Sequence, residues 1–314
     1  MISIQKYVRA KSLEEAYQLN QSRANRVIGG MLWLKTGSGS VNTAIDLCDL
    51  GMDGIEETQE EFFIGAMTSL RQVELHQGLN EYTQGAAGAA VRDIIGVQFR
   101  NLATVGGSIW GRFGFSDVLT FFLSLETFVE LYQGGIVPLE QFAGMEYDRD
   151  ILVRLIVKKK PGVFAYRAFR NQRTDLPVLT CALSRIEGEY RAVVGARPGR
   201  AVVVRDGERL LSGGQMEEGH SMREAYALEG RQAMEEEQST EGRLSMGEAY
   251  ALEGRRAMEE EQSAEGRYNA FSAYVARVVP MGSNTRGSAA YRTHLVRVLT
   301  ERNLMQINDL KYTD

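Results

Sequence analysis

Residues 96–108 read GVQFRNLATVGGS, and Asp117 follows nine residues after Ser108. This stretch contains the second of two glycine pairs, and the first lies in Val27-Ile28-Gly29-Gly30-Met31-Leu32. A glycine pair allows a turn with positive φ and lets bare N–H groups approach an anion such as a pyrophosphate. Together the pairs suggest a dinucleotide clasp. Neither has the G-x-G-x-x-G spacing of a Rossmann fingerprint or the G-x-x-x-x-G-K-[ST] spacing of a nucleoside-triphosphate loop.

Composition indicates an ordinary globular protein. With 314 residues, 44% hydrophobic and 25% charged, the chain can bury a sizeable core and is expected to form two or three domains. The net charge of -5 leaves no basic stripe, so we expect neither nucleic acid nor an anionic membrane surface as a partner. The first residues lack a secretory signal, and the most apolar stretch, residues 118–131, is too short and polar to span a bilayer. The expected location is the cytoplasm.

Cysteine and histidine are too sparse and scattered to predict a metal centre. The chain has Cys48 and Cys181, which we expect to be buried thiols in a reducing cytosol, and no C-x-x-C pair. His76, His220 and His294 lack ligand spacing and the setting of a Ser-His-Asp triad. We therefore predict no bound metal and no catalytic residue of the chain's own.

The hydrophobic pattern predicts a mixed α+β fold. Ser12, with Glu15 three residues on, is typical of a capped helix start. Short strands are expected over residues 26–28, 44–47 and 62–66, and the small residues of 68–93 favour helices.

The sequence pattern changes in the later part of the chain, where strands are expected to predominate. A loop is predicted over residues 110–117 and a strand over 151–157, followed by a strand meander over 177–211. This composition shift places a domain boundary near residues 160–175.

Residues 221–243 and 245–267 are near copies of each other, offset by 24 positions. Their composition favours helix, but two copies are fewer than a solenoid needs to bury its own faces. We interpret residues 221–267 as a tolerated helical insertion, with a partner-docking element as the alternative.

The stretch from Gly96 to Asp117 resembles the signature of the FAD-binding (medium) subunits of molybdenum hydroxylases, a family that includes xanthine dehydrogenase and carbon monoxide dehydrogenase. The family pattern is Arg-Asn, then Thr-Ile/Val-Gly-Gly-Asn/Ser, then a downstream Asp, which Arg100-Asn101, Thr104–Ser108 and Asp117 match. Further resemblances follow in the family's order and cover nearly the whole chain: Tyr7–Ala16, Val27–Leu34, Ile64–Thr68, Val137–Phe142, Ile151-Leu152, Phe164–Arg167 and Arg286–Arg292.

The resemblance implies an α+β architecture of three parts. Residues 1–165 would form a PCMH-type FAD-binding domain whose two subdomains meet near residues 55–62. Residues 166–314 would form a C-terminal α+β domain with a three-stranded antiparallel sheet and the insertion.

The resemblance also implies a set of cofactor-binding residues around a non-covalent FAD. One group would wrap the pyrophosphate through backbone N–H groups: Arg26, Val27, Ile28, Gly29, Gly30, Met31, Leu32 and Trp33. A second would close on it from the other side: Thr104, Val105, Gly106, Gly107 and Ser108. Asp117 would accept hydrogen bonds from the ribose or the adenine side, Leu152 would pack near the flavin, and Arg167 would replace a lysine near the ring. Because Met31-Leu32 stands where the family has a hydroxyl residue, the backbone must suffice there.

The implied function is electron transfer. Electrons would come from [2Fe-2S] clusters in a partner subunit and leave through FAD to NAD⁺ or another acceptor, while a molybdenum-pterin subunit acts on the substrate, with purines suggested by the commonest family members. Two alternatives stay open at this stage. A stand-alone FAD oxidoreductase would need a proton donor, for which Ser116 and Glu126 are the candidates, and a cofactor-free interaction protein would use the glycine pairs only as turns.

Overall fold

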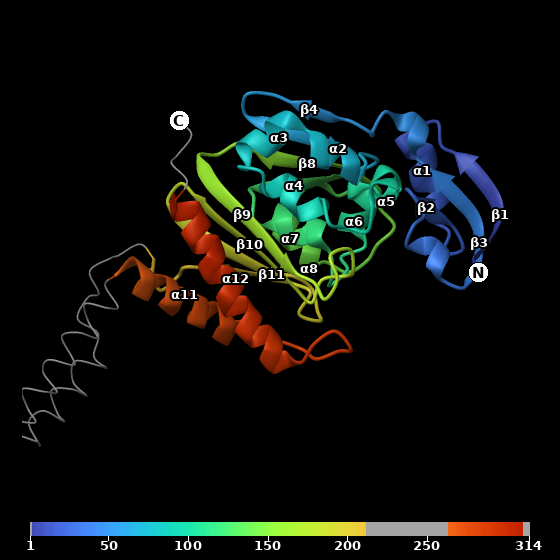
Figure 1. Ribbon diagram of the computed structural model, residues 1–314. Helices are drawn as coiled ribbons and strands as arrows, with labels where there is room; N and C mark the ends of the chain where they lie inside the picture. The colour runs from blue at the N-terminus through green and yellow to red at the C-terminus, as the bar shows by residue number, and fades with distance from the viewer. Residues whose placement is uncertain (1, 212–262, 310–314) are drawn as a thin grey trace, which may run out of the picture. The chain divides into compact units, whose positions relative to one another are not determined.

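Three parallel strands open the fold. The computed structural model describes residues 2–211 and 263–309, and its first sheet has the order β1-β3-β2. This part consists of β1 (Ile2–Arg9), α1 (Leu13–Asn20), β2 (Arg26–Ile28), η1 (Leu34–Thr36) and β3 (Gly39–Asp46). Ser12 caps α1 as predicted, because its hydroxyl accepts the N–H of Glu15 at 3.1 Å. The first glycine pair therefore leaves the carboxyl end of the edge strand β2 (Figure 1).

A second sheet is antiparallel, with the order β4-β5-β8-β6-β7. After η2 (Cys48–Leu50), its strands are β4 (Ile55–Glu57), β5 (Glu61–Gly65), β6 (Thr127–Leu131), β7 (Gly135–Pro138) and β8 (Leu152–Lys158). The strands predicted at residues 62–66 and 151–157 are β5 and β8.

Short helices follow β5. They are α2 (Leu70–Leu75), α3 (Gln77–Tyr82), α4 (Ala86–Val91), α5 (Val97–Leu102), α6 (Val105–Trp110), α7 (Asp117–Leu123) and α8 (Leu139–Gly144). The helical region predicted over residues 68–93 is thus divided into α2, α3 and α4. His76 ends α2 and caps α3, where its Nδ1 accepts the N–H of Leu79 at 3.1 Å. Gly85 begins α4 with φ 81°, a conformation that glycine adopts without strain.

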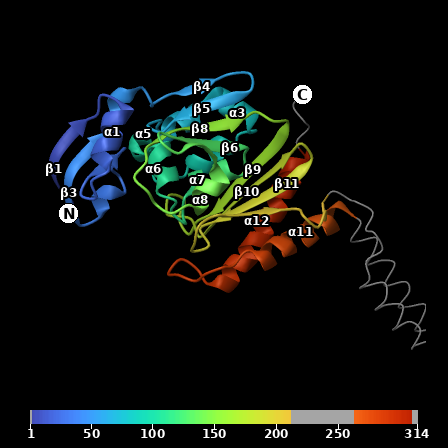
Figure 2. The same cartoon turned by 180° about the vertical axis from the view of Figure 1, so that it is seen from behind.

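A third sheet has four antiparallel strands in the order β12-β11-β10-β9. They are β9 (Gly162–Phe169), β10 (Leu179–Ile186), β11 (Glu189–Gly195) and β12 (Val202–Arg205). The resemblance implied three strands; β10, β11 and β12 fall in the meander predicted over residues 177–211, and β9 is the additional strand. One face of this sheet contacts α4 and α7, and α12 (Ala289–Asp309) lies across β9 and β10 (Figures 1 and 2). A common core joins residues of the second and third sheets and of the helices between them.

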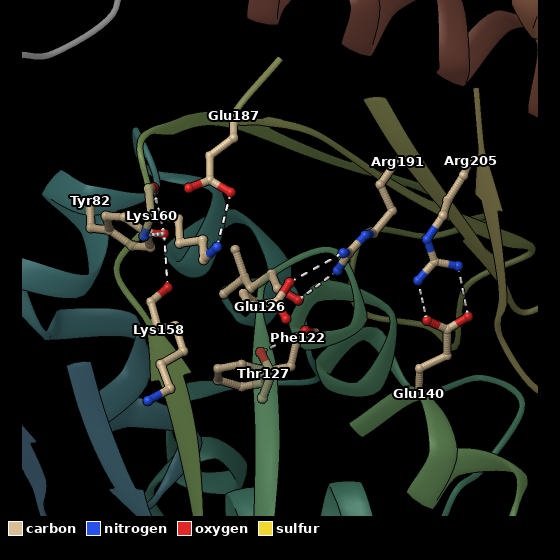
Figure 3. A network of polar contacts seen from close by, with 11 residues as sticks. Tyr82, Phe122, Glu126, Thr127, Glu140, Lys158, Lys160, Glu187, Arg191 and Arg205 are labelled. Atoms are coloured by element: carbon tan, nitrogen blue, oxygen red, sulfur yellow. Dashed lines mark hydrogen bonds and ion pairs between the residues drawn. The ribbon is translucent and has the colours of Figure 1, made fainter. Parts of the chain in front are cut away.

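Polar contacts also link the third sheet and its turns to segments that adjoin the second sheet (Figure 3). Lys160 pairs with Glu187 at 2.9 Å, Arg191 with Glu126 at 3.3 Å, and Arg205 with Glu140. Such partly exposed ion pairs add little stability, so the apolar core between the sheets dominates.

The duplication lies outside the described residues except for residues 263–267, where α11 (Ala264–Val278) begins. Among the helices of the described part, none is both long and apolar enough to cross a membrane. The division at residue 165 stays a prediction.

Candidate functional site

Both glycine pairs line one cavity with a volume of about 1010 Å³. The cavity walls include most of the residues that the sequence predicts for the site. These are Arg26, Val27, Ile28, Gly29, Gly30, Met31, Leu32, Trp33, Thr104, Gly106, Gly107, Ser108, Asp117 and Leu152. Val105 and Arg167 are not among the lining residues.

The first glycine segment, residues 29–33, presents its backbone to the cavity. Within the described part of the chain, the N–H groups of these five consecutive residues have no hydrogen-bond acceptor. Their carbonyls are used instead, since Met31 and Trp33 accept the N–H groups of Lys35 and Thr36 at 2.9 and 3.1 Å. Met31 has φ 59°, which turns the chain into η1. A run of bare N–H groups on a turn is a site for an anion.

In the second glycine segment, residues 104–108, the N–H groups of residues 105–108 already have acceptors within the protein. Thr104 caps α6, and the N–H of Gly107 donates to its hydroxyl at 3.1 Å. The N–H groups of Val105 and Gly106 donate to the carbonyls of Thr68 and Ala66, both at 2.8 Å. Ser108 donates its N–H and its hydroxyl to the carbonyl of Thr104. The expectation of bare N–H groups here was therefore wrong, because a capped helix starts where a turn was expected.

The glycines serve close approach rather than unusual dihedral angles. Neither pair has positive φ, contrary to the expectation from the sequence. A Cβ on Gly30 would lie 1.8 Å from the carbonyl oxygen of Leu102, and one on Gly29 would lie 2.6 Å from Oγ1 of Thr104. A Cβ on Gly106 would lie 2.6 Å from the carbonyl oxygen of Ala66. Each of these glycines thus lies against a neighbouring chain segment at a distance that only glycine allows, and Gly29 joins the first segment to Thr104 of the second.

Asp117 is buried at the start of α7 and lines the cavity. Its Oδ1 accepts the hydroxyl of Tyr166 at 2.6 Å and Nη2 of Arg170 at 2.5 Å. Burial is the largest influence and raises the pKa of the Asp117 carboxyl, whereas Arg170 and Tyr166 oppose that shift. The carboxyl is thereby held in one orientation at the cavity wall.

Successive side chains of β9 point to opposite faces of the third sheet, and this explains the position of Arg167. Tyr166 faces Asp117, so its neighbour Arg167 points to the other face of the sheet, where its Nη2 donates to Gln306 of α12 at 3.0 Å. Arg170, which the sequence analysis missed, lines the cavity from just beyond the end of β9. The two-residue period of a strand, applied from Tyr166, would have indicated it. Val105 is fully buried in the core.

Two arginines brace the cavity from outside the glycine segments. Arg100, from the Arg-Asn motif, is buried and donates to Glu74 at 2.7 Å and to the carbonyl of Ile94 at 3.2 Å. Burial raises the pKa of Glu74, but its hydrogen bonds with Arg100 and Arg71 outweigh this and hold the pKa below its ordinary value. Arg149 donates to the carbonyls of residues 20, 22 and 25, which ties the loop before β2 to the segment before β8.

The remaining candidate groups contribute little chemistry. Ser116 lines the cavity, but its hydroxyl caps α7, and Glu126 pairs with Arg191 away from the cavity lining. Cys181 is buried as expected, whereas Cys48 is exposed because it follows β3 on a surface turn. In residues 2–211 and 263–309, no three His, Cys, Asp or Glu side chains gather as metal ligands do, and His220 lies outside these residues.

Comparisons with known proteins agree with this geometry. Residues 2–159 match the family described as "FAD binding domain in molybdopterin dehydrogenase". The fold is similar to that of a Cu,Mo-CO dehydrogenase, with TM-score 0.73 and 18% identity over 98% of this chain and 99% of that one. It is also similar to quinoline 2-oxidoreductase from Pseudomonas putida 86, with TM-score 0.71 and 14% identity over 97% and 96%. The uncharacterized protein YgfM of Escherichia coli K12 is 24% identical over 71% of this chain and 85% of its own length.

Proposed function

The chain belongs to the family of FAD-binding domains in molybdopterin dehydrogenases, which makes it a flavoprotein component of an oxidoreductase, and we propose that it binds FAD non-covalently in the described cavity. The observation that carries this proposal is the run of five bare N–H groups in the first glycine segment, which lines a cavity large enough for a dinucleotide.

The proposal assigns different roles to the two glycine segments. Residues 29–33 would donate backbone hydrogen bonds to the pyrophosphate. Residues 104–108 would shape the wall behind it, because their own N–H groups already have acceptors within the domain. Asp117 would accept a hydrogen bond from a ligand hydroxyl, and Leu152, which is buried at the start of β8, would pack against an apolar part of the cofactor.

The flavin supplies the redox chemistry when it is bound, and the protein residues bind and orient it. Apolar residues that line the cavity, among them Leu70, Ile94 and Phe99, would exclude water from it. The proposed role of the chain is that of an electron-transfer subunit. It would act between the [2Fe-2S] clusters of one partner subunit and NAD⁺ or another acceptor, with molybdenum-pterin in a further subunit and purines as the candidate substrates. We propose the cytoplasm as its location.

An absorption spectrum of the purified full-length chain tests cofactor binding. We expect the two visible flavin bands, and we expect acid treatment to release the cofactor into solution as intact FAD. Anaerobic addition of NADH to a second sample tests the acceptor, since bleaching of the bands would support NAD⁺. A folded, colourless protein that takes up no added FAD would contradict the proposal.

Affinity purification of the tagged chain from its native cells would test the partners, because iron–sulfur and molybdenum-pterin subunits should accompany it.

A further inference from the structure

Three aromatic side chains meet at the cavity beside the first glycine segment. Trp33 lies with its ring centroid 5.1 Å from Phe113 and 4.9 Å from Phe115. The rings of Phe113 and Phe115 are 5.2 Å apart and within 5° of parallel. All three residues, called the aromatic cluster below, line the cavity.

The two phenylalanines are firmly held. Between them, Gly114 accepts the N–H of Ala196 at 2.6 Å, and a Cβ on Gly114 would lie 2.5 Å from the carbonyl oxygen of Gly199. Ser116, directly after Phe115, caps α7. The loop that carries both rings is therefore fixed to the connection between β11 and β12.

Trp33 is placed differently, because 51% of its surface is exposed although it is a large apolar residue. Its own N–H belongs to the bare N–H run, so its indole adjoins the proposed anion site. An exposed indole backed by two rings provides a flat apolar surface. Aromatic rings and nucleotide bases stack on such surfaces with a sequence-tolerant but substantial gain in affinity.

We propose that Trp33, backed by Phe113 and Phe115, is a stacking platform for one of the two planar heteroaromatic rings of the bound dinucleotide. This inference rests on the proposed FAD site. Both the isoalloxazine and the adenine of FAD are joined through short chains to the pyrophosphate, and the platform adjoins the N–H groups proposed to bind that pyrophosphate. Trp33 is thus a positioning residue that fixes the ring at one end of the cofactor.

Calorimetric titration of the full-length apoprotein tests the platform. The Trp33→Leu variant should bind FAD roughly tenfold more weakly than the wild type, the order expected for loss of one stacked ring. Trp33→Phe keeps an aromatic face and should recover most of the affinity. Tyr291→Leu is the matched control, since it removes an aromatic residue that is 40% exposed on α12 and does not line the cavity. It should bind FAD like the wild type.

Two half-ligands identify the ring. If adenine stacks on Trp33, Trp33→Leu should weaken the binding of ADP and leave the binding of riboflavin 5′-phosphate unchanged. If the isoalloxazine stacks there, the variant should weaken the binding of riboflavin 5′-phosphate and leave that of ADP unchanged. Thermal unfolding verifies that each variant is folded, and Trp33→Met replaces the leucine variant if that one is not. A folded non-aromatic variant that binds FAD within twofold of the wild type overturns the platform. A wild type that binds no FAD would instead count against the proposed function.

Discussion

The two glycine segments contain the same dipeptide but differ in what their backbone can bind. In the first, residues 29–33, five N–H groups lack acceptors within the described residues. In the second, residues 104–108, the N–H groups donate to Ala66, Thr68 and Thr104. The difference arises from their surroundings. Thr104 starts a helix, whereas Met31 turns the chain away from β2 with positive φ. A Gly-Gly dipeptide therefore does not by itself identify an anion site.

The contrast has an energetic basis. Buried N–H groups without acceptors are costly, so the second segment, which forms the start of α6, must satisfy its donors within the protein. The first segment borders a cavity, where water or a ligand can accept its N–H groups. The first segment is thus available for binding. The second segment and the end of α5 before it provide the rigid wall against which Gly29 and Gly30 lie.

The largest effect is expected from Gly30→Ala. The added Cβ would lie 1.8 Å from the carbonyl oxygen of Leu102, at the end of α5 just before the second segment, so the backbone must shift there. We expect a loss of about 3 kcal/mol in the free energy of unfolding, the upper part of the range for overpacking. FAD affinity should fall by at least about a hundredfold, or roughly 3 kcal/mol. Chemical denaturation and FAD titration measure both. Gly144→Ala is the control, since nothing lies within 4 Å of a Cβ at that position.

Gly106→Ala places the same change in the second segment. Its Cβ would meet the carbonyl oxygen of Ala66 at 2.6 Å, inside the packing of α6 on β5. Overpacking there should cost about 2 kcal/mol of stability. The protein that remains folded should bind FAD with an affinity within a few-fold of the wild type. If instead its affinity falls as far as that of Gly30→Ala, the distinction between a binding segment and a wall segment is wrong.

The sequence predicted much of this arrangement but not the difference between the segments. Apolar periodicity located β5 and β8, and Ser12 marked the start of α1, because these signals are local. Which N–H groups are bare depends on the carbonyls of Ala66 and Thr68, which only the tertiary fold brings to residues 105 and 106. No local pattern contains that information.

The position of Arg167 illustrates a second limit. Its order in the motif suggested a place near the cofactor, but the face of a strand on which a residue lies depends on what covers each face. Here α12 covers the face that carries Arg167, and the cavity receives Arg170. In the third sheet, the meander predicted over residues 177–211 contains β10, β11 and β12, whereas β9 lies before it and pairs with β10.

Glu74→Gln tests the support of α5, whose end lies against Gly30. Glu74 holds Arg100, whose helix α5 ends at Leu102 against Gly30. Loss of a charged hydrogen-bond partner should cost about 2 kcal/mol at neutral pH. The folded-state pKa of Glu74 lies below its ordinary value of 4.5, so this stabilisation is present above that pH and is lost as pH falls through the folded pKa.

Unfolding of the wild type and of Glu74→Gln should therefore be compared from neutral to acidic pH. The two stabilities should converge as the solution becomes acidic, because protonated glutamic acid and glutamine are both neutral. A stability difference that stays constant down to the lowest pH would mean that the Glu74 charge does not brace α5.

The smallest effect is expected at Thr104, where the two segments meet. Its Oγ1 caps α6 by accepting the N–H of Gly107, and it lies 2.6 Å from the position that a Cβ on Gly29 would take. Thr104→Val keeps the shape but removes the cap, which should cost about 1 kcal/mol of stability, while Thr104→Ser should cost less because it keeps the hydroxyl. Removing the cap also frees the N–H of Gly107 beside the cavity. If the second segment binds no phosphate, FAD affinity should change by less than about threefold in Thr104→Val, well under 1 kcal/mol. Tighter binding of FAD by this variant would show that a second-segment N–H group reaches the pyrophosphate once it is released, and the division between the two segments would then depend on the cap alone.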